Sequence, residues 1–423
     1  MVQFLLFEVG MVQETINSSK KALGHLRVIE IGEEIGEFCC KTFADMGADV
    51  IRIEPPGGAE TRDIGPFYKN ERNPERSLHF WSYNLNKRSI TIDLESNQGQ
   101  LLLKKLVKES DILVESTPAN WMEERNLDYT TLSKVNPKLI FVSISPFGRV
   151  GPHSQMHGGE LVAWASSGYM YTTGWKWQKP THPWGRQASH AAGLFAVTGA
   201  MAAIFERRRT GLGKQIDVSM QKSVASTVEQ NVPFYIGDGV VSGRRENDHV
   251  NGFGGSKLIE CKDGWVHMNI GWRNGHNEIV EWMKEEGMAE DLTDEKWHDS
   301  KFHRENFPHV LDTITKWAKR KTKAEFFHQG QERGLECGPV NSVAEALNDP
   351  QMQSREFWVE VEHPEISDGE KFTYPGAPCI LSETPWAARR RAPLIGEDNE
   401  NIFQELLGLS SKDQDELKNK NII

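Results

Sequence analysis

A serine and a histidine stand side by side in the segment GRQASHAAGLF, which runs from Gly185 to Phe195. A hydroxyl with an imidazole as its base can attack a carbonyl carbon, so the pair could serve nucleophilic catalysis. Neighbouring side chains on one helix, however, diverge by about 100° and do not face each other. A serine directly before a long helix is an ordinary N-cap. We therefore expect Ser189 to cap a helix and not to form a dyad with His190.

One carboxylate, Glu160, also lies where it could serve chemistry. It follows two glycines in HGGELVAWASSG and begins a helical stretch. This position suits an acid in the first turn of a helix, where the helix dipole favours negative charge. It equally suits an active-site carboxylate that a tight glycine turn exposes. The residues alone leave both interpretations open.

Two further segments could contact a ligand. NLNKRS places Lys87 and Arg88 before the predicted strand ITIDL, where they could clamp phosphates, although a solvated basic turn explains them as well. GFGGS, residues 252–256, could be a lid or a source of backbone N–H donors over a reacting carbonyl. A turn between strands is the simpler interpretation of that segment. Neither segment identifies a function by itself.

Two classes of bound group are disfavoured. The turn after the first predicted strand is GEEIGE, which lacks the paired glycines of a dinucleotide site and puts three glutamates where a pyrophosphate would lie. The five cysteines are widely scattered, so neither metal-binding spacing nor a disulfide framework is present. We expect no NAD, no metal and reduced cysteines.

The charge of the chain limits its partners. The 423 residues include 49 basic and 60 acidic side chains, for a net charge of −11. This disfavours nucleic acid and anionic membranes, and a polyanionic ligand would need a local basic pocket. No run approaches the roughly 18 to 20 unbroken apolar residues of a membrane span, and the N-terminus is a poor signal peptide. We expect a cytoplasmic protein.

The apolar pattern places these candidates on an α/β scaffold. LRVIEIG, ADVIRIE, ILVES and KLIFVSIS are predicted as strands with helices between them, which is typical of a parallel sheet covered on both faces. A long helix is predicted over residues 190–209, with an apolar side formed by Ala191, Leu194, Val197, Met201 and Ile204. We expect a large domain in residues 1–225, a small domain with a hairpin at Asp263–Gly264 in residues 226–335, and a segment 336–423 that returns to the large domain.

Several segments, in order, resemble the class III CoA-transferases, the CaiB/BaiF-type family that includes the carnitine and bile-acid CoA-transferases and formyl-CoA transferase. They are ADMGADVIRIEPPGG, NLNKRSITIDL, DILVES, LIFVSISPFGRVGP, SSGYMYTTG, GLGKQIDVSM and YPGAPCILSETPW with RRRAPLIGEDN. No single segment is diagnostic. The ordered set covers nearly the whole chain and is highly specific.

The resemblance implies a Rossmann-like large domain, a smaller α+β domain and two ring-shaped subunits interlocked like chain links, with CoA or acyl-CoA as substrate. By position, it places one set of residues near the CoA: Arg52, Asn86, Lys87 and Arg88. The arginine that the family has in the following helix is either displaced to Arg125 or replaced by Glu124. The family's Asn-Phe contact after the VE strand end is here Ser116-Thr117. Gly252, Gly254 and Gly255 match a mobile glycine loop that closes over the active site.

The chemistry of the resembled family depends on an aspartate whose carboxylate attacks the thioester and forms an acyl anhydride. This aspartate lies four residues before the first glycine of the long helix, and here that position is Ser189, four before Gly193. Glu160, 189 − 160 = 29 residues earlier, matches another family position, and HPWGRQASHAAG contains no carboxylate. An acyl-serine ester lies well below a thioester in free energy, so Ser189 should not support CoA transfer.

The resemblance therefore implies a CoA-transferase subunit without its own nucleophile, paired with a homologous subunit that supplies the aspartate in an interlocked heterodimer or heterotetramer. We expect it to move CoA from an acyl-CoA such as succinyl-CoA to a carboxylic acid, with benzylsuccinate, from anaerobic toluene degradation, as one candidate. Two alternatives stay open: a self-sufficient homodimer that uses Glu160, and a non-enzymatic CoA-ester-binding or scaffolding protein.

Overall fold

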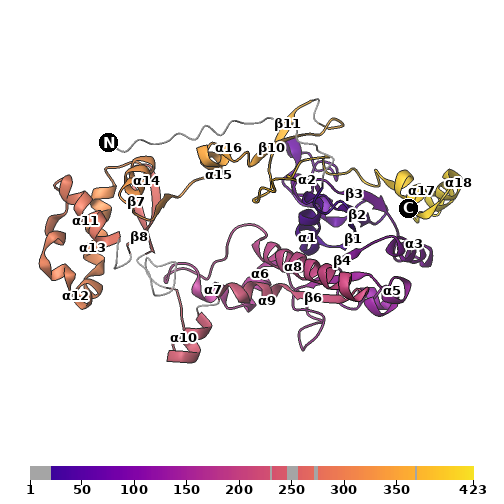
Figure 1. Ribbon diagram of the computed structural model, residues 1–423, viewed down its shortest axis with the longest axis horizontal. Coiled ribbons are helices and arrows are strands. Elements are labelled where there is room, and N and C mark those ends of the chain that lie inside the picture. Colours follow the sequence, from indigo (N-terminus) through magenta and orange to yellow (C-terminus); the bar gives the residue numbers. More distant parts are fainter. Residues whose placement is uncertain (1–20, 229–230, 245–255, 271–274, 367–368) are drawn as a thin grey trace. The chain divides into compact units, whose positions relative to one another are not determined.

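The computed structural model describes residues 21–228, 231–244, 256–270, 275–366 and 369–423 (Figure 1). The chain divides into two units. The first unit extends to His157 and also includes Ser189–Met220 and Glu356–Ile423, while the second comprises Gly158–Ala188 and Gln221–Arg355. The domain limits expected at residues 225 and 335 stay predictions.

A six-stranded sheet in the order β3-β2-β1-β4-β5-β6 forms the centre of the first unit, and every neighbouring pair of strands is parallel. The strands are β1 (Arg27–Gly32), β2 (Asp49–Glu54), β3 (Arg88–Thr91), β4 (Ile112–Ser116), β5 (Ile140–Ser145) and β6 (Gln215–Ser219). Buried β-branched and leucine side chains dominate them, as expected for strands covered on both faces. The predicted α/β fold with a parallel sheet is confirmed.

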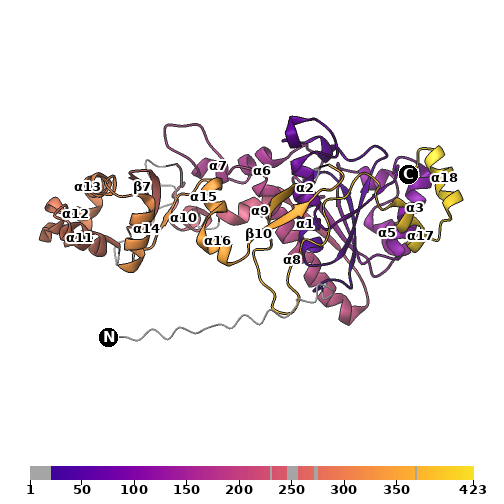
Figure 2. The ribbon, with the colours of Figure 1, turned by 90° about the horizontal axis from the view of Figure 1, so that it is seen from above.

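Helices cover both faces of this sheet (Figure 2). On one face α3, α5, α17 and α18 pack on isoleucines of β1, β2 and β3, and on the other face lie α1 and α8. The helices of the first unit are α1 (Glu34–Asp45), α2 (Leu78–Asn84), α3 (Asn97–Lys108), α4 (Trp121–Glu124), α5 (Tyr129–Val135), α8 (Gln187–Thr210), α17 (Asn399–Leu407) and α18 (Ser411–Asn419).

Helix α8 differs from its prediction in two respects. It begins at Gln187, so Ser189 is its third residue, and the expectation that Ser189 caps the helix is wrong. Its buried face is an alanine stripe at helical spacing (Ala192, Ala196, Ala200 and Ala203), whereas Leu194 is 53% exposed. Small side chains are needed because α8 approaches α1 closely: a Cβ on Gly193 would lie 3.0 Å from the backbone nitrogen of Cys39.

Among the described residues, α8 is also the one helix long and apolar enough to cross a membrane. Serine, threonine and glycine interrupt its apolar sequence, which is why the sequence showed no unbroken run. Its alanine face is buried against the protein, as in the core helix of a globular fold.

The C-terminal segment is anchored to the first unit by Asn86. The backbone of Asn86 has a φ of +65°, which asparagine tolerates better than most residues. Its side-chain oxygen accepts hydrogen bonds from the N–H groups of Arg389 and Arg390, and its side-chain nitrogen donates to the carbonyl of Ala387. The antiparallel pair β10 (Trp358–Glu362) and β11 (Lys371–Pro375) precedes this junction.

The second unit contains a three-stranded antiparallel sheet of β7 (Ser256–Cys261), β8 (Gly264–Asn269) and β9 (Cys337–Pro339). Cys261 pairs with Gly264 across the β7–β8 turn, which confirms the predicted hairpin. The helices of this unit are α6 (Glu160–Ser166), α7 (Tyr169–Thr172), α9 (Met220–Ala225), α10 (Asn231–Asp238), α11 (Gly275–Glu285), α12 (Ser300–Glu305), α13 (Phe307–Ala318), α14 (Lys323–Glu332), α15 (Val343–Leu347) and α16 (Pro350–Ser354).

A buried ionic network joins the sheet of the first unit to α1. Arg52 on β2, 1% exposed, contacts Glu30 on β1 at 2.5 Å and Glu37 on α1 at 3.0 Å. The ammonium of Lys87 lies 2.8 Å from the second oxygen of Glu30. Burial alone would raise the pKa of the Glu37 carboxyl, but the cations around it outweigh burial and lower the pKa to about 2. The network therefore holds ionised groups in the core because each has a partner.

We expect Arg52→Met to lower the free energy of unfolding by about 3–5 kcal/mol, because it leaves Glu30 and Glu37 buried without this cation. The matched control is Arg88→Met, which removes a partly exposed pair with Asp49, a residue that keeps a second arginine partner. The control should cost about 1 kcal/mol or less. Urea unfolding measures the free energy of unfolding of both variants. Equal decreases in the two variants would contradict the claim that the buried pairs of Arg52 stabilise the fold more than the partly exposed pair of Arg88.

Two histidines form a buried pair in the second unit. The Nε2 atom of His303 lies 3.3 Å from Nδ1 of His276, and both residues are less than 10% exposed. Burial, with the neighbouring histidines, lowers the pKa of His276 to about 4, and burial also lowers the pKa of His303. The unfolded chain binds more protons than the folded chain at mildly acidic pH, so acid should destabilise this unit.

We therefore expect the free energy of unfolding to fall by about 2 kcal/mol between pH 7 and pH 5 because of His276, with the loss starting below the ordinary histidine pKa. Urea unfolding at a series of pH values measures this slope. His276→Leu should reduce the slope by this amount, whereas His25→Gln, at an exposed position, should leave it unchanged. An unchanged slope in His276→Leu would disprove the assignment.

Candidate functional site

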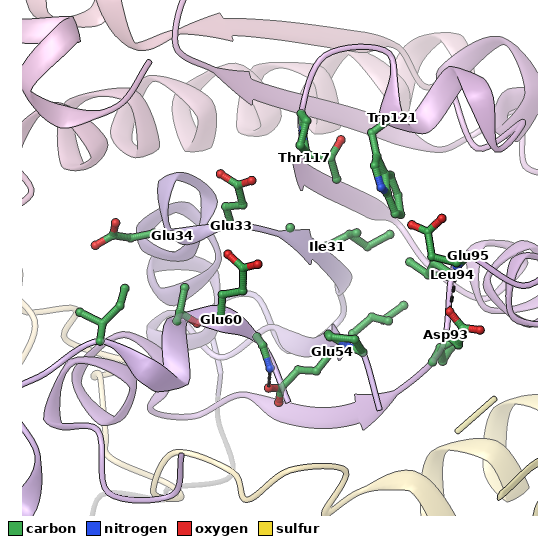
Figure 3. A pocket seen from close by; sticks show the side chains of 18 residues that line it. Ile31, Glu33, Glu34, Glu54, Glu60, Asp93, Leu94, Glu95, Thr117 and Trp121 are labelled. Carbon is green, nitrogen blue, oxygen red and sulfur yellow. Dashed lines mark hydrogen bonds between the residues drawn. The ribbon is translucent and has the colours of Figure 1, made fainter. Parts of the chain in front are cut away.

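The candidate site is a pocket of about 550 Å³ at the carboxyl ends of β1, β2, β3 and β4 (Figure 3). In open α/β sheets ligands bind outside these ends, and near the point where the strand order reverses. Here the reversal lies between β1 and its neighbour β4. The pocket is lined by Ile31, Gly32, Glu33, Glu34, Ile53, Glu54, Pro55, Ala59, Glu60, Thr61, Ile64, Ile92, Asp93, Leu94, Glu95, Thr117, Pro118 and Trp121.

The packing of two strand ends shapes the pocket floor. Gly32 closes β1 with a φ of +113°, and a Cβ there would lie 2.8 Å from the backbone of Ser116, the last residue of β4. The hydroxyl of Ser116 donates to the carbonyl of Glu33 at 2.8 Å. Glycine is required here because any side chain would collide with β4. The chain then turns directly into α1.

The pocket combines apolar walls with an acidic rim. Isoleucines at the ends of β1, β2 and β3 and the ring of Trp121 form the walls. Glu33 and Glu60 reach toward the pocket from one side, and Asp93 and Glu95 lie at the other side (Figure 3). No lysine or arginine is among the described residues that line it.

The acids of the rim repel one another. The pKa of Glu33 is raised by burial and by the charges of Glu60 and Glu34. Glu54 differs, because Arg62 contacts its two oxygens at 2.6 and 2.8 Å and the hydroxyl of Ser89 donates to it. The charge of Glu54 is therefore balanced by Arg62, and the negative charge of the rim comes mainly from the other carboxylates that line the pocket.

Arg125 lies beside the pocket without lining it. Its guanidinium stacks over Trp121 at 4.2 Å, and its Nη2 atom lies 2.6 Å from a Glu95 oxygen. The pair lowers the pKa of Glu95, chiefly through that hydrogen bond. Arg125 therefore already neutralises a carboxylate of the chain.

CoA does not fit the residues of this pocket. Its diphosphate and 3′-phosphate groups are usually held by lysine, arginine or free backbone N–H groups. The pocket is lined by carboxylates and, among the described residues, by no lysine or arginine, and the first turn of α1, which would attract an anion, carries Glu34 beside Glu33. Thr117 lines the pocket, so the position expected for a CoA contact is present without the charges that CoA needs.

The residues expected near the CoA do not gather at this pocket. Arg52 and Lys87 belong to the buried ionic network, and Asn86 holds the C-terminal segment. Arg88 begins β3 at the amino end of the sheet, opposite the pocket, with both carboxylate oxygens of Asp49 as partners. Their contacts with CoA stay predictions that this geometry does not support.

Ser189 lies in the first turn of α8 and is 4% exposed. The ring of His190 stacks on Phe38 at a centroid distance of 4.0 Å, and its Nε2 atom lies 2.7 Å from the hydroxyl oxygen of Tyr83. His190 therefore packs against α1 and α2 of the first unit, which gives no support to a serine-histidine dyad.

Glu160 is tied to the start of α8. One of its oxygens accepts hydrogen bonds from the N–H of Ala188 at 2.5 Å and from the indole nitrogen of Trp164 at 3.0 Å. Ala188 directly precedes Ser189 in the chain. Glu160 thus satisfies one of the otherwise unpaired N–H groups of the first helical turn, as a capping acid does.

The other expected features have mixed outcomes. Aromatic residues gather in the second unit, where Trp175 stacks on Trp177 and Trp184 is 95% exposed. Gly252, Gly254 and Gly255 lie outside the described residues. Within the described ranges, no group of three or more histidine, cysteine or acidic side chains could hold a metal ion.

Sequence reasoning missed most residues of the pocket, among them Glu60, Asp93, Glu95 and Trp121. A signal for three of these was available, because Asp93 and Glu95 follow shortly after β3 and Trp121 follows shortly after β4. Residues that follow strands of a parallel sheet meet at one edge, so their positions pointed to this pocket.

Known proteins provide an independent comparison. The model of CoA-transferase family III matches residues 23–399. The chain is 32% identical over 388 residues to the BbsE subunit of succinyl-CoA:(R)-benzylsuccinate CoA-transferase from Thauera aromatica, which covers 90% of this chain and 93% of that protein. It is 29% identical to succinate–glutarate CoA-transferase from Agrobacterium fabrum, over 92% of this chain and 96% of that protein.

A solved structure supports the same assignment. A CaiB/BaiF family protein from Brucella suis matches with a TM-score of 0.80 and 26% identity, over 91% of this chain and 99% of that chain. The family model, the relatives and this structural match all extend over nearly the whole chain, and the resemblance found in the sequence is confirmed. This chain is a member of CoA-transferase family III.

Proposed function

We propose that this chain is the subunit without a nucleophile in a two-subunit CoA-transferase, and that a homologous partner supplies the catalytic aspartate. The observation that carries the proposal is Ser189, a buried serine at the start of α8. The resemblance drawn from the sequence implies that the family's nucleophile stands at this position, and the segment HPWGRQASHAAG contains no carboxylate that could replace it.

The chemistry of CoA transfer supports this choice. A carboxylate nucleophile forms an anhydride, which is as reactive as a thioester and can return the acyl group to CoA. A serine hydroxyl would form an ester, from which the return step is strongly uphill. Transfer in both directions therefore requires the carboxylate of another subunit.

An exposed apolar stripe on α8 supports the presence of a partner. Leu194 and Phe205 lie on the side of the helix opposite the buried alanines and are 53% and 76% exposed, and Phe195 beside them is 50% exposed. Large apolar side chains gathered on one helix face favour contact with another protein. We propose that the homologous subunit covers this stripe in an interlocked assembly.

The substrates follow from the relatives. The relatives from Thauera aromatica and Agrobacterium fabrum are named as acting with succinyl-CoA or succinate. We therefore propose succinyl-CoA as donor and a carboxylic acid, such as benzylsuccinate, as acceptor. The aromatic residues Tyr169, Tyr171, Trp175, Trp177 and Trp184 of the second unit would suit an acid with a ring. We also propose that the enzyme acts in the cytoplasm.

The first test compares nucleophile positions in the co-purified complex. Ser189→Ala in this chain should leave kcat/KM within about twofold, because the hydroxyl takes no part in transfer. Replacing the partner's aspartate with alanine should lower kcat/KM by about three orders of magnitude or more. If Ser189→Ala inactivates the complex as fully as the aspartate change, the proposal is wrong.

The second test addresses Glu160, whose place beside the start of α8 favours the alternative of a self-sufficient enzyme. Purified alone, the chain should exchange no CoA between succinyl-CoA and an acceptor acid. In the complex, Glu160→Gln keeps a side-chain oxygen that can accept from Ala188, so activity should stay within about threefold.

Transfer by the chain alone that Glu160→Gln abolishes would instead establish the self-sufficient enzyme. A complex that transfers nothing with any homologous subunit would favour the binding or scaffolding protein. Ser167→Ala, at the end of α6, serves as a control for changes near this helix.

A further inference from the structure

We infer that the pocket at the carboxyl ends of β1 to β4 in this chain excludes CoA by charge, so that the assembled enzyme binds CoA in the partner's pocket alone. The inference rests on the proposed function, because it concerns the subunit that lacks the nucleophile. It adds a stoichiometry of one CoA for each pair of subunits.

The acidic rim is built from separate elements that converge on one opening. Glu33 precedes α1, Glu60 begins a short 3-10 helix after β2, and Asp93 and Glu95 follow β3. Figure 3 shows Glu33 and Glu60 on one side of the pocket and Asp93 and Glu95, with Trp121 nearby, on the other. An entering anion meets the carboxylates of Glu33 and Glu60 on one side and that of Asp93 on the other, whereas Arg125 already pairs with Glu95.

Two arginines near the rim, Arg62 and Arg125, are already engaged by carboxylates of the chain. Arg62 is 1% exposed and its guanidinium holds Glu54, and Arg125 holds Glu95. Arg125 also donates to the carbonyl of Trp121, which fixes its direction. Releasing either arginine to a phosphate would leave a carboxylate without its partner, so neither is a free phosphate ligand.

The start of α1 is closed to phosphate for the same reason. A helix N-terminus attracts anions through its free N–H groups and its dipole. In this chain the residue before α1 is Glu33 and its first residue is Glu34, and both line the pocket. The carboxylates of Glu33 and Glu34 thus lie at the helix N-terminus, where a diphosphate group would otherwise bind most favourably.

The test measures binding of free CoA to the purified full chain, and to its complex with the partner, by isothermal titration calorimetry at low salt. We expect no saturable binding to the chain alone and one CoA for each pair of subunits in the complex. The double variant Glu33→Gln/Glu60→Lys should gain affinity for CoA by about tenfold or more, and added salt should weaken that gain.

The matched control is Glu400→Gln/Asp415→Lys, which makes the same change in net charge at exposed positions on α17 and α18. It should leave CoA binding unchanged, which separates a local effect from a change in overall charge. Should the double variant fail to fold, Glu60→Gln alone and the stoichiometry of the wild-type complex still decide the question.

The outcomes distinguish this inference from the proposed function. Stoichiometric CoA binding to a chain that transfers nothing alone, or two CoA molecules for each pair of subunits, overturns the inference and leaves the proposed function intact. Transfer by the isolated chain overturns both. A chain that rejects CoA, and that no homologous subunit makes active, supports charge exclusion while refuting the proposed function.

Discussion

The buried ion pairs of Arg52 are the contacts on which the first unit depends. Arg52 lies on β2 and links this strand to β1 and α1 through Glu30 and Glu37. Lys87, which directly precedes β3, also pairs with Glu30 and so ties the start of β3 to the same network. These elements carry the pocket at their carboxyl ends, so its position follows from the network. A buried charge without its partner is strongly destabilising, so the ion pairs favour a single register between the sheet and α1.

The segment that contains Lys87 also holds the C-terminal part of the chain against the first unit. Asn86 holds the backbone at Arg389 and Arg390, about three hundred residues later in the sequence, and Ser89 accepts a backbone hydrogen bond from Gly396. Residues 86–89, NKRS, therefore stabilise the fold of this chain. Its basic residues look like phosphate ligands in the sequence because an ion pair inside the fold and an ion pair with a ligand require the same side chains.

The candidate site combines a pocket suited to a small-molecule ligand with an acidic rim. The parallel sheet, the glycine turn after β1 and the pocket suit a small-molecule ligand, yet the rim is acidic and the start of α8 carries a serine. Under the proposed function, a subunit without a nucleophile can vary these residues as long as it still supports its partner. The acidic rim is compatible with a stable fold because the buried network of Arg52, Glu30, Glu37 and Lys87 does not line the pocket.

The sequence by itself determined the parallel α/β order, the hairpin of the second unit, the family and the missing carboxylate near Ser189. These follow from local periodicity, from turn residues and from ordered motifs, which need no knowledge of distant contacts. Only the tertiary structure decided that α8 buries alanines and not Leu194, that Arg52 and Lys87 face glutamates, and that three separate segments bring an acidic rim around one pocket. Those outcomes depend on which side chains meet across the fold, and a charge in a sequence does not reveal its partner.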